Sequence, residues 1–385
     1  MNAVTRNITA LMKKDLMKKF VFLAGPRQVG KTTIAHSIIK SEKGVYLNYD
    51  IDEDRVEILK KNYVHNSWVC LDEFHKFKRW KQHIKGVYDK YHNNLHLLLT
   101  GSARLDIYQK SGDSLFGRYY LFHLHPLTLG EINNKECPPL LSNVHEIRDS
   151  QKGIEELLKF GGFPEPFIVQ SEIEHRRWSN ARRSLLIKED LRDISQIQLL
   201  SLAEQLMIIL PSKIGSIFSY NSLAEDLRIS VPTVQTWLEV FQKLYITFKI
   251  LPYTKSITRS IQKQPKFYLY DWSQVEDTGA RFENFIASHL WKAVHVWNDL
   301  GEATLDLFYI RDRDGKEVDF VITKERKPWF LVEVKIAEAS CSHSLHYFSE
   351  RLNIPACQIV LQKNIYKKMG NITIVSADQW LGWLP

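Results

Sequence analysis

The stretch FLAGPRQVGKTTIAHSI, Phe22 to Ile38, passes from an apolar run through two glycines and a lysine into a helix-like segment. Gly25 to Thr32 satisfy the pattern G-x-x-x-x-G-K-[ST], which is typical of a phosphate-binding P-loop. The apolar FVFLA before it predicts a strand, and TTIAHSIIK after it predicts a helix, which is the context that such a loop requires. The sequence therefore predicts a nucleoside triphosphate site in an α/β fold.

The residue types of this loop suit phosphate binding. Glycines let successive backbone N–H groups curve around a β-phosphate, and the N-terminus of the following helix adds its positive dipole end. Lys31 is expected to reach the β- and γ-phosphate oxygens and the Thr32 hydroxyl to ligate Mg²⁺, while Thr33 is mainly helix scaffold. The predicted cofactors are ATP and Mg²⁺, with nucleotide contacts from Gly25, Pro26, Arg27, Gln28, Val29, Gly30, Lys31, Thr32, Thr33 and Ser102.

An acidic pair follows in the segment SWVCLDEFHK. The apolar residues Trp68 to Leu71 predict a buried strand that ends at Asp72 and Glu73, and α/β sheets bind their ligands at this carboxyl edge. Asp72 is expected to hold the Mg²⁺ shell and Glu73 to polarise the attacking water. The alternative is a strand that ends in two solvated acids.

The segment LHLLLTGS predicts another central strand, which places Thr100 and Ser102 beside the γ-phosphate, where a polar side chain senses its presence. VYLNYD and FVFLA are further strands, each followed by a helical pattern. A repeated strand and helix pattern of this kind favours a mostly parallel sheet.

Taken together, the motifs resemble a known family along nearly the whole chain. It comprises AAA-type ATP-binding proteins of bacteria and archaea that pair an N-terminal P-loop ATPase with a C-terminal region filed as a domain of unknown function. The motifs, in order, are GPRQVGKTT, LDEFHK, LTGSARLD, SLFGRYYLFHLHPLTLGE, FGGFPEP, PKFYLYDWSQVEDTGARFEN and EVDFVI…LVEVK.

The resemblance also implies a catalytic arginine and an oligomer. By analogy, Arg118 in FGR looks like an arginine finger that acts on the ATP of a neighbouring subunit, with Arg104 as the competing candidate. A surface salt bridge is the alternative for both arginines. Ser102 departs from the asparagine that many AAA+ proteins carry at this position, which puts water positioning by Ser102 in doubt. A finger that works between subunits implies a homo-oligomer, expected to be a ring.

The middle of the chain predicts a helix-turn-helix. In NSLAEDLRISVPTVQTWLEVF, Ser222 and Glu225 fit a capping box, residues 228–230 form a turn, and the second helix has one apolar face. That face consists of Val234, Trp237, Leu238 and Phe241. The strand that follows, a basic stretch and the return strand FYLYD complete the pattern of a winged helix.

Five cations occur around the predicted wing without an intervening acid: Lys249, Lys255, Arg259, Lys263 and Lys266. Such a wing is suited to following a phosphate backbone. The second helix offers Thr233, Gln235, Thr236 and Glu239 instead of a row of arginines, which argues against strong base-specific readout. A purely structural winged helix is the alternative.

The C-terminal part carries a second acidic pattern. In EVDFVI and LVEVKI, residues alternate between apolar and polar, so Asp319, Glu333 and Lys335 are expected on one side of a half-buried sheet. This pattern, D…E-x-K, is that of restriction-endonuclease-like nucleases, and Glu283 in GARFENFI matches the acidic residue of their first helix. E-x-K alone is weak evidence, because Glu325 and Lys327 form another one inside a polar turn.

These residue types suit phosphodiester hydrolysis. Asp319 and Glu333, helped by Glu283, are expected to bind one or two Mg²⁺ ions that polarise the phosphodiester and lower the pKa of a bound water. Lys335 is expected to orient that water or to neutralise the transition state. Whether the metal site is active stays open, because a shared fold does not establish turnover.

Composition limits the other possibilities only loosely. The chain has 385 residues and a formal net charge of +8, which fits an anionic partner, although the excess is small for this length. Its four cysteines form no C-x-x-C pair, so neither a disulfide framework nor a structural zinc site is expected. The sequence shows no signal peptide and no apolar run of membrane-spanning length, and we expect a cytoplasmic protein without a membrane partner.

The sequence thus predicts an α/β protein of four parts: an AAA+ type P-loop ATPase (1–155), a helical lid (156–200), a winged helix (201–268) and a PD-(D/E)XK nuclease-like domain (269–385). The predicted function is ATP-driven processing of DNA, with cleavage by the C-terminal domain. Two alternatives remain: an ATPase switch whose nuclease-like domain binds without cutting, and a remodeller of polypeptides.

Overall fold

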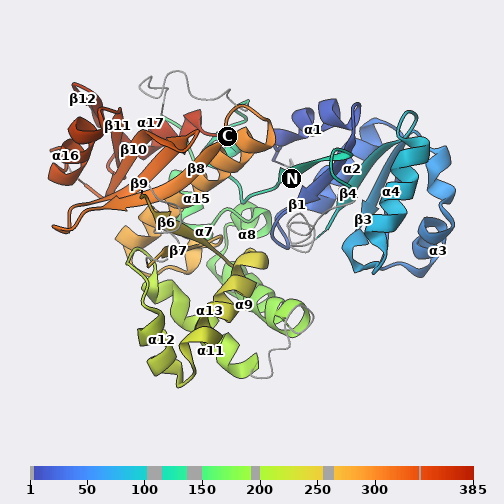
Figure 1. Ribbon diagram of the computed structural model, residues 1–385, viewed down its shortest axis with the longest axis horizontal. Coiled ribbons are helices and arrows are strands. Elements are labelled where there is room, and N and C mark those ends of the chain that lie inside the picture. Colours follow the sequence, from blue (N-terminus) through green and yellow to red (C-terminus); the bar gives the residue numbers. More distant parts are fainter. Residues whose placement is uncertain (1–3, 102–114, 137–149, 192–199, 255–263, 338–339) are drawn as a thin grey trace. The chain divides into compact units, whose positions relative to one another are not determined.

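The computed structural model describes residues 4–101, 115–136, 150–191, 200–254, 264–337 and 340–385. The chain forms two compact units, Met1–His125 and Pro126–Pro385 (Figure 1). Residues 126–155, which the sequence assigned to the first domain, therefore lie in the second unit.

Unit 1 is built on a five-stranded sheet in the order β2-β3-β4-β1-β5, and every pair of neighbours is parallel. The prediction of a parallel sheet is confirmed. The strands are β1 (Phe20–Ala24), β2 (Val45–Asn48), β3 (Trp68–Asp72), β4 (His96–Thr100) and β5 (Tyr119–His123). The helical elements are α1 (Ile8–Leu16), α2 (Lys31–Ser41), α3 (Asp52–Lys60), η1 (Asn62–His65), η2 (Phe74–Lys76) and α4 (Trp80–Tyr91).

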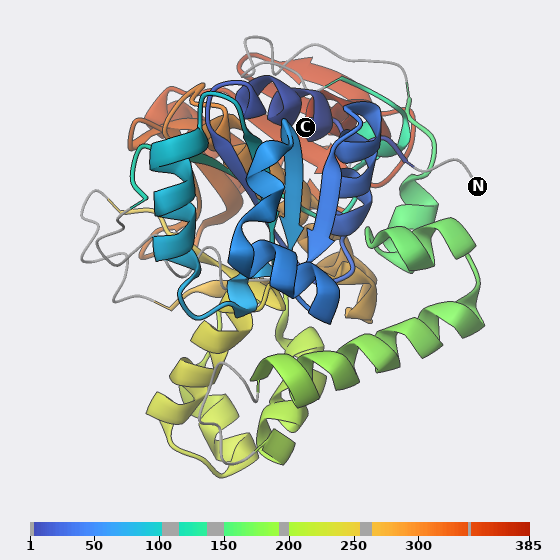
Figure 2. The ribbon, with the colours of Figure 1, turned by 90° about the vertical axis from the view of Figure 1, so that its right-hand side faces the viewer.

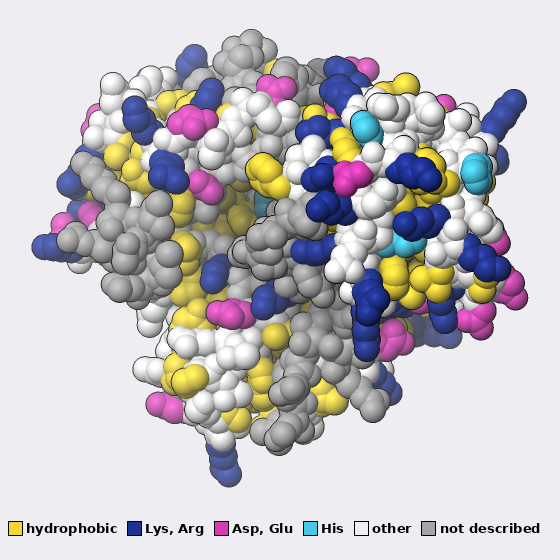
Figure 3. All heavy atoms as spheres, turned by 45° about the vertical axis from the view of Figure 1, so that its right-hand side comes forward, with side chains coloured by type: hydrophobic (Ala, Val, Ile, Leu, Met, Phe, Trp, Pro, Cys, Tyr) yellow, Lys and Arg dark blue, Asp and Glu magenta, His cyan; other side chains and the backbone are white. Residues whose placement is uncertain are grey.

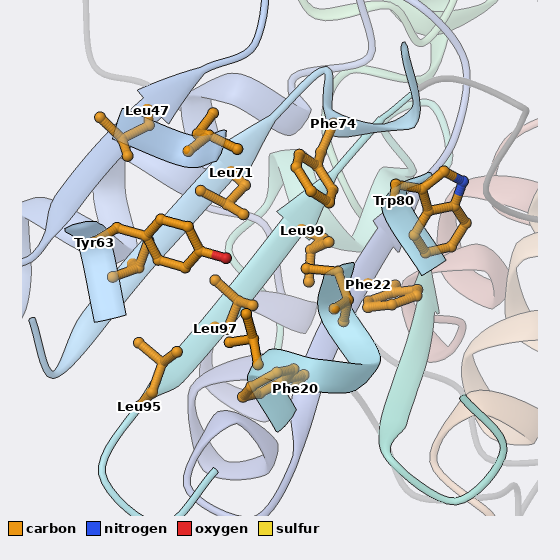
Figure 4. Close-up of a cluster of buried hydrophobic side chains, with 14 of the residues drawn as sticks. Phe20, Phe22, Leu47, Tyr63, Leu71, Phe74, Trp80, Leu95, Leu97 and Leu99 are labelled. Atoms are coloured by element: carbon orange, nitrogen blue, oxygen red, sulfur yellow. The ribbon is translucent and has the colours of Figure 1, made fainter. Parts of the chain in front are cut away.

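Alternation along the strands divides the apolar residues between the two faces of this sheet. One face contributes residues such as Phe20, Phe22, Leu71, Leu97 and Leu99 to a buried cluster that Phe74 and Trp80 help to close (Figure 4). Since both faces of the central strands are buried, polar side chains are left mainly at strand ends, where the ligand-binding edge lies.

Unit 2 begins with helices, which are drawn in green and yellow in Figure 2. These are α6 (Leu129–Ile132), α7 (Ile154–Phe160), α8 (Pro164–Val169), α9 (Glu172–Leu185), the π-helical η4 (Leu186–Leu191), α11 (Leu200–Ile209), η5 (Leu210–Lys213), α12 (Tyr220–Leu227) and α13 (Val231–Lys243). The predicted turn at residues 228–230 separates α12 from α13. The predicted apolar face of α13 is buried, as expected.

The predicted start of α12 is wrong by three residues. Ser219, not Ser222, is the N-cap: its hydroxyl accepts a hydrogen bond of 3.3 Å from the backbone N–H of Ser222, which lies in the first turn. Both residues precede the same apolar pattern, so the sequence spacing alone does not separate the two possible caps.

An eight-stranded sheet forms the rest of unit 2, in the order β12-β13-β11-β10-β9-β8-β6-β7. Its strands are β6 (Thr247–Pro252), β7 (Lys266–Leu269), β8 (Leu305–Arg311), β9 (Glu317–Lys324), β10 (Lys327–Lys335), β11 (Ala356–Val360), β12 (Tyr366–Met369) and β13 (Ile372–Ser376). The helical elements are η6 (Trp272–Gln274), α15 (Thr278–Asp299), α16 (His343–Leu352), α17 (Ala377–Trp380) and η7 (Leu381–Trp383).

The hairpin after α13 is part of this sheet. β6 pairs antiparallel with β7 and parallel with β8, where Leu251 lies opposite Phe308. The domain boundary predicted at residue 268 thus falls within β7. The consequence is that side chains of β7 can reach α15 and β9, which carry the acidic residues of the C-terminal pattern.

Candidate functional sites

The P-loop joins the end of β1 to the start of α2, as the sequence predicts. Gly30 is the N-cap of α2 with φ 103°, and Gly25 has φ 151°. A Cβ atom at Gly25 would lie 2.3 Å from the carbonyl oxygen of Leu124, so the backbone of β5's continuation leaves no room for a side chain there. These two positions require glycine for conformation and space.

Lys31 lies over its own loop. Its Nζ donates hydrogen bonds to the carbonyl oxygens of Gly25 at 2.9 Å and Pro26 at 2.6 Å. Arg6, which the sequence analysis missed, donates from Nη1 to the carbonyl oxygen of Val29 at 2.9 Å and from Nη2 to that of His125. The loop is therefore held closed around a buried ammonium group at the N-terminus of α2, the usual setting for phosphate binding.

Asp72 receives three hydroxyl groups at the end of β3. Thr32 Oγ1 donates to Asp72 Oδ2 at 2.8 Å, Tyr46 donates to the same oxygen at 2.5 Å, and Thr100 Oγ1 donates to Oδ1. Burial opposes ionisation of Asp72, but the hydrogen bonds from Thr100, Tyr46 and Thr32 outweigh it and hold the pKa below its ordinary value. The site thus keeps a carboxylate beside the Thr32 hydroxyl, a pair of oxygen donors suited to Mg²⁺.

Glu73 follows in a left-handed backbone conformation with φ 53°. Its buried Oε2 atom has no hydrogen bond, and it lies 3.6 Å from His75 Nδ1 and 3.8 Å from Lys76 Nζ. Burial raises the pKa of Glu73 above its ordinary value, and the neighbouring Asp72 adds to this effect. A carboxylate with a raised pKa and an oxygen that forms no hydrogen bond has the character of a general base.

Of the predicted sensor and arginine-finger residues, the structure describes Thr100 and Arg118. Ser102 and Arg104 lie outside the described residues. Thr100, expected beside the γ-phosphate, donates its hydroxyl to Asp72. Arg118 precedes β5, and its Nε lies 2.8 Å from Asp89 Oδ1. Because β5 runs parallel to β1, Arg118 lies about 17 Å along the sheet from the P-loop edge, at about 3.3 Å per residue.

A second buried cluster of charges lies in unit 2, and Lys266 is at its centre. The Lys266 side chain is 2% exposed, and its Nζ lies 2.8 Å from Glu317 Oε1, 3.3 Å from Glu283 Oε1 and 3.6 Å from Asp319 Oδ1. Burial disfavours its charge, but the carboxylates of Glu283, Asp319 and Glu317 outweigh it and raise the pKa of Lys266. The prediction that Lys266 follows a phosphate backbone together with the other cations of the wing is wrong, because β7 extends the sheet and turns this side chain inward.

Glu333 and Lys335 lie beside this cluster on β10, on one face as predicted. Lys335 Nζ lies 2.9 Å from Glu333 Oε1, which also accepts a hydrogen bond of 3.3 Å from the Ser342 hydroxyl. Asp319 Oδ2 accepts a hydrogen bond of 2.9 Å from the backbone N–H of Val334, so it reaches from β9 to β10. Asp319 thus connects the two halves of the cluster.

Excess negative charge shifts the titration of two members. Burial and the charge of Asp319 raise the pKa of both Glu283 and Glu333 to about 7. Glu333 Oε2 is buried and has no hydrogen-bond partner. Burial opposes the charge of Lys335, but Glu333 outweighs it and raises the pKa of this lysine.

The donor set of the cluster fits a divalent cation only in part. The donors are oxygens, and the unpartnered Glu333 Oε2 and the surplus of carboxylates favour a cation on the side of Asp319 and Glu333. However, no three His, Cys, Asp or Glu side chains of the described ranges gather closely enough to hold a metal. The ammonium group of Lys266 lies where Glu283 and Asp319 approach each other.

The sequence analysis missed several members of this cluster. Tyr268 donates its hydroxyl to Glu283 Oε1 at 2.7 Å, and Glu317 accepts Lys266. On β11, Gln358 Oε1 accepts a hydrogen bond of 2.7 Å from the N–H of Ser342, which holds that residue against Glu333. Period-two spacing, which relates Tyr268 to Lys266 and Glu317 to Asp319, was a usable signal for Tyr268 and Glu317.

Replacing Lys266 by methionine is expected to destabilise unit 2 by about 3–5 kcal/mol, because three buried carboxylates lose their counter-ion. The effect should be smaller below pH about 7, where Glu283 takes up a proton. Urea unfolding across this pH range measures it. Mg²⁺ should raise the melting temperature of the variant more than that of the wild type.

Lys249 on β6 provides the control, since it is half-buried and forms no ion pair with a described residue. Lys249→Met should leave both the unfolding free energy and its Mg²⁺ dependence nearly unchanged. Equal losses in the two variants would show that Lys266 does not balance the cluster.

Three family models match successive parts of the chain. Residues 17–133 match a family described as an AAA domain. Residues 151–275 and 278–380 match two families described as domains of unknown function, DUF8612 and DUF4143. The match to an AAA domain thus covers most of unit 1, including the P-loop and the acidic pair Asp72 and Glu73. Among the described residues, no helix combines the length and apolar character that a membrane crossing requires.

The chain is similar to other proteins over most of its length, at 20–24% sequence identity. An uncharacterized protein of Mycobacterium tuberculosis is 20% identical over 396 residues, which cover 98% of this chain and 84% of that protein. Another uncharacterized protein, from Methanocaldococcus jannaschii, is 24% identical over 371 residues, covering 88% and 80%. The Thermotoga maritima RuvB Holliday junction branch migration motor is 15% identical with a TM-score of 0.30, covering 67% of this chain and 92% of that one. That score is below the level at which two chains share an overall fold.

Proposed function

We propose that this protein uses ATP hydrolysis in unit 1 to process DNA, which the carboxylate cluster of unit 2 cuts. The observation that carries the proposal is that one chain contains two separate groups of side chains of the types that phosphate chemistry uses. They are Lys31, Thr32 and Asp72 around the P-loop, and Asp319, Glu333 and Lys335 in the cluster. The lid, winged-helix and nuclease-like segments expected at 156–200, 201–268 and 269–385 belong to this proposal.

In unit 1, Lys31 leaves the loop carbonyls to bind the β- and γ-phosphates. Thr32 and Asp72 would hold Mg²⁺, which would neutralise phosphate charge when bound. Glu73 has a raised pKa, and its Oε2 atom forms no hydrogen bond, so we assign it to orient the attacking water and to take its proton. Arg118 is too far from its own P-loop, so we assign it to the ATP of a neighbouring subunit in a homo-oligomeric ring.

In unit 2, Asp319 and Glu333 would hold Mg²⁺, with Glu283 as a third ligand only if the carboxylates move closer together and the Lys266 ammonium gives way. A bound Mg²⁺ would polarise the phosphodiester and acidify a water. Lys335 is held by Glu333 and is nearly half exposed, so it neutralises charge that develops on the phosphate. Ser342 and Gln358 fix the position of the Glu333 carboxylate.

DNA is the proposed substrate of the carboxylate cluster, while the P-loop takes ATP, and we place the protein in the cytoplasm. The described surface in Figure 3 carries more widespread Lys and Arg than Asp and Glu side chains, in line with the net charge of +8. Lys255, Arg259 and Lys263 of the wing, which lie outside the described residues, are proposed to contact the phosphate backbone.

A non-cutting ATPase switch is the second candidate, and the position of Lys266 favours it. An internal ammonium group between Glu283 and Asp319 satisfies part of the charge that a metal would otherwise balance. In this case the cluster is a stable core for DNA or protein binding.

DNA is expected to stimulate ATP hydrolysis severalfold. ATP turnover of the purified protein is measured without DNA and with linear, forked and four-way DNA, at fixed salt concentration because phosphate contacts are salt-dependent. Turnover indifferent to every DNA would contradict DNA processing and leave the switch or the polypeptide remodeller.

A further inference from the structure

A groove of about 920 Å³ in unit 2 adjoins the carboxylate cluster. It lies between α9, the segment 207–216 and the residues from η6 into the first turns of α15, all in the part of the chain that Figure 2 shows in green to orange. Glu283 of the cluster lies in its lining. Neither the P-loop chemistry nor the proposed cutting reaction accounts for this groove.

One wall of the groove is cationic. Arg176, Asn180 and Arg183 line it from α9, and their spacing of four and then three residues places them on one face of this helix. Neither arginine forms an ion pair with a described residue, in contrast to Arg177 on the adjacent face, whose Nη1 lies 2.8 Å from Glu174 Oε1. The two guanidinium groups are therefore available for an anionic ligand.

The wall contributed by residues 207–214 is largely apolar. It consists of Met207, Ile208, Pro211 and Ile214 with Ser212 among them. Ile208 is 54% exposed, a large value for an isoleucine beside a groove. A ligand that matches both walls has anionic groups on one side and flat or apolar groups on the other.

Gly215 makes the connection between the groove and the cluster. It has φ +79°, and a Cβ atom there would lie 3.4 Å from Glu283 Oε2 and 3.3 Å from Ala280 Cβ. A side chain at this position would stand between the groove and the Glu283 carboxylate. The bare backbone leaves that oxygen facing the groove.

Acidic side chains also line the groove, and most are already engaged. Asp277 Oδ1 accepts the N-cap hydrogen bond from Ala280 N–H at 2.8 Å, and Glu283 lies in the cluster with Lys266. Glu276 is exposed, next to the cap of α15. The acidic side chains of the groove thus lie around the start of α15, whereas Arg176 and Arg183 line it from α9.

We propose that this groove binds a single strand of nucleic acid and leads it to the carboxylate cluster. The phosphates lie along Arg176 and Arg183, and the bases pack against the apolar surface of Ile208 and Pro211. A cationic groove that follows the backbone is a general feature of proteins that bind single strands without sequence preference. A groove of this volume fits a few nucleotides but not a duplex, whose major groove alone is about 12 Å wide. The inference rests on the proposed function, to which it adds the form of the substrate.

The test measures binding of the full-length protein to a fluorescently labelled single strand by anisotropy, in EDTA so that no cutting occurs. The double variant Arg176→Ala with Arg183→Ala should bind at least about 10-fold more weakly. Its slope of log K against log salt should fall by about 1.4, at about 0.7 per phosphate contact. Arg177→Ala, on the same helix but outside the groove, should bind like the wild type.

The outcomes are distinct. If Arg177→Ala weakens binding of the single strand as much as the double variant does, or if the double variant does not weaken it, the proposal that the groove binds the strand is overturned. This holds even if the wild type cuts DNA. Displacement of the labelled strand by duplex or by an acidic polypeptide as efficiently as by an unlabelled single strand also overturns it. If the double variant binds more weakly but the wild type does not cut DNA, strand binding in the groove is supported and only the proposed cleavage is contradicted.

Discussion

Lys31→Ala is expected to lower ATP turnover at least about 100-fold, the usual cost of removing one preorganised group that stabilises transferring phosphate. Lys31 lies at the first position of α2 and is the group whose ammonium must move from the carbonyl oxygens of Gly25 and Pro26 to the phosphates. Its removal takes away a buried positive charge while leaving the helix start intact, because alanine is a good helix former.

The measurement compares steady-state ATP turnover and the affinity for a fluorescent ATP analogue in the variant and the wild type. Lys40→Ala, an exposed lysine in the last turn of the same helix, is the matched control and should leave both unchanged. Turnover that survives Lys31→Ala would show that the hydrolysis measured does not come from this loop.

The local part of this site could be predicted from the sequence, and the contacts between strands could not. Loop, helix start and acidic pair are each continuous segments, and the structure places Thr32 against Asp72 as expected. Tyr46 reaches Asp72 because β2 lies next to β3, and Thr100 does so because β4 lies on the other side. Strand order is a property of the whole sheet, so neither hydroxyl was assigned to Asp72 in advance.

Lys266 is a similar case in unit 2. Its sequence neighbours are basic and polar, which favours a solvated wing. The parallel pairing of β6 with β8 places the hairpin at the edge of the C-terminal sheet, and burial between α15 and β9 follows from that pairing. A pattern of one segment does not contain this information, although the alternation of Glu317 with Asp319 indicated a second acid on the same face.

Lys335→Ala is expected to reduce DNA cleavage at least about 100-fold while ATP turnover stays unchanged. The Lys335 Nζ is the only cation of the set predicted to cut DNA, Asp319, Glu333 and Lys335, and Glu333, 2.9 Å away, favours its charged form. Its loss also removes the ion-pair partner of Glu333, whose carboxylate keeps its contacts with the Ser342 hydroxyl and the backbone of Asp319. Removing the lysine thus affects both the charge at the phosphate and the position of a proposed metal ligand.

The chain contains its own control for this experiment. Lys327, in the second E-x-K, lies exposed at the start of the same strand, opposite Lys324 and far along β10 from Asp319. Cleavage of linear, forked and four-way DNA with Mg²⁺ should survive Lys327→Ala and fail in Lys335→Ala and in Asp319→Asn. Cleavage that persists in both of the latter variants would separate cutting from this cluster. Lys266 would then be read as the permanent counter-ion of a core that binds DNA or protein without cutting it.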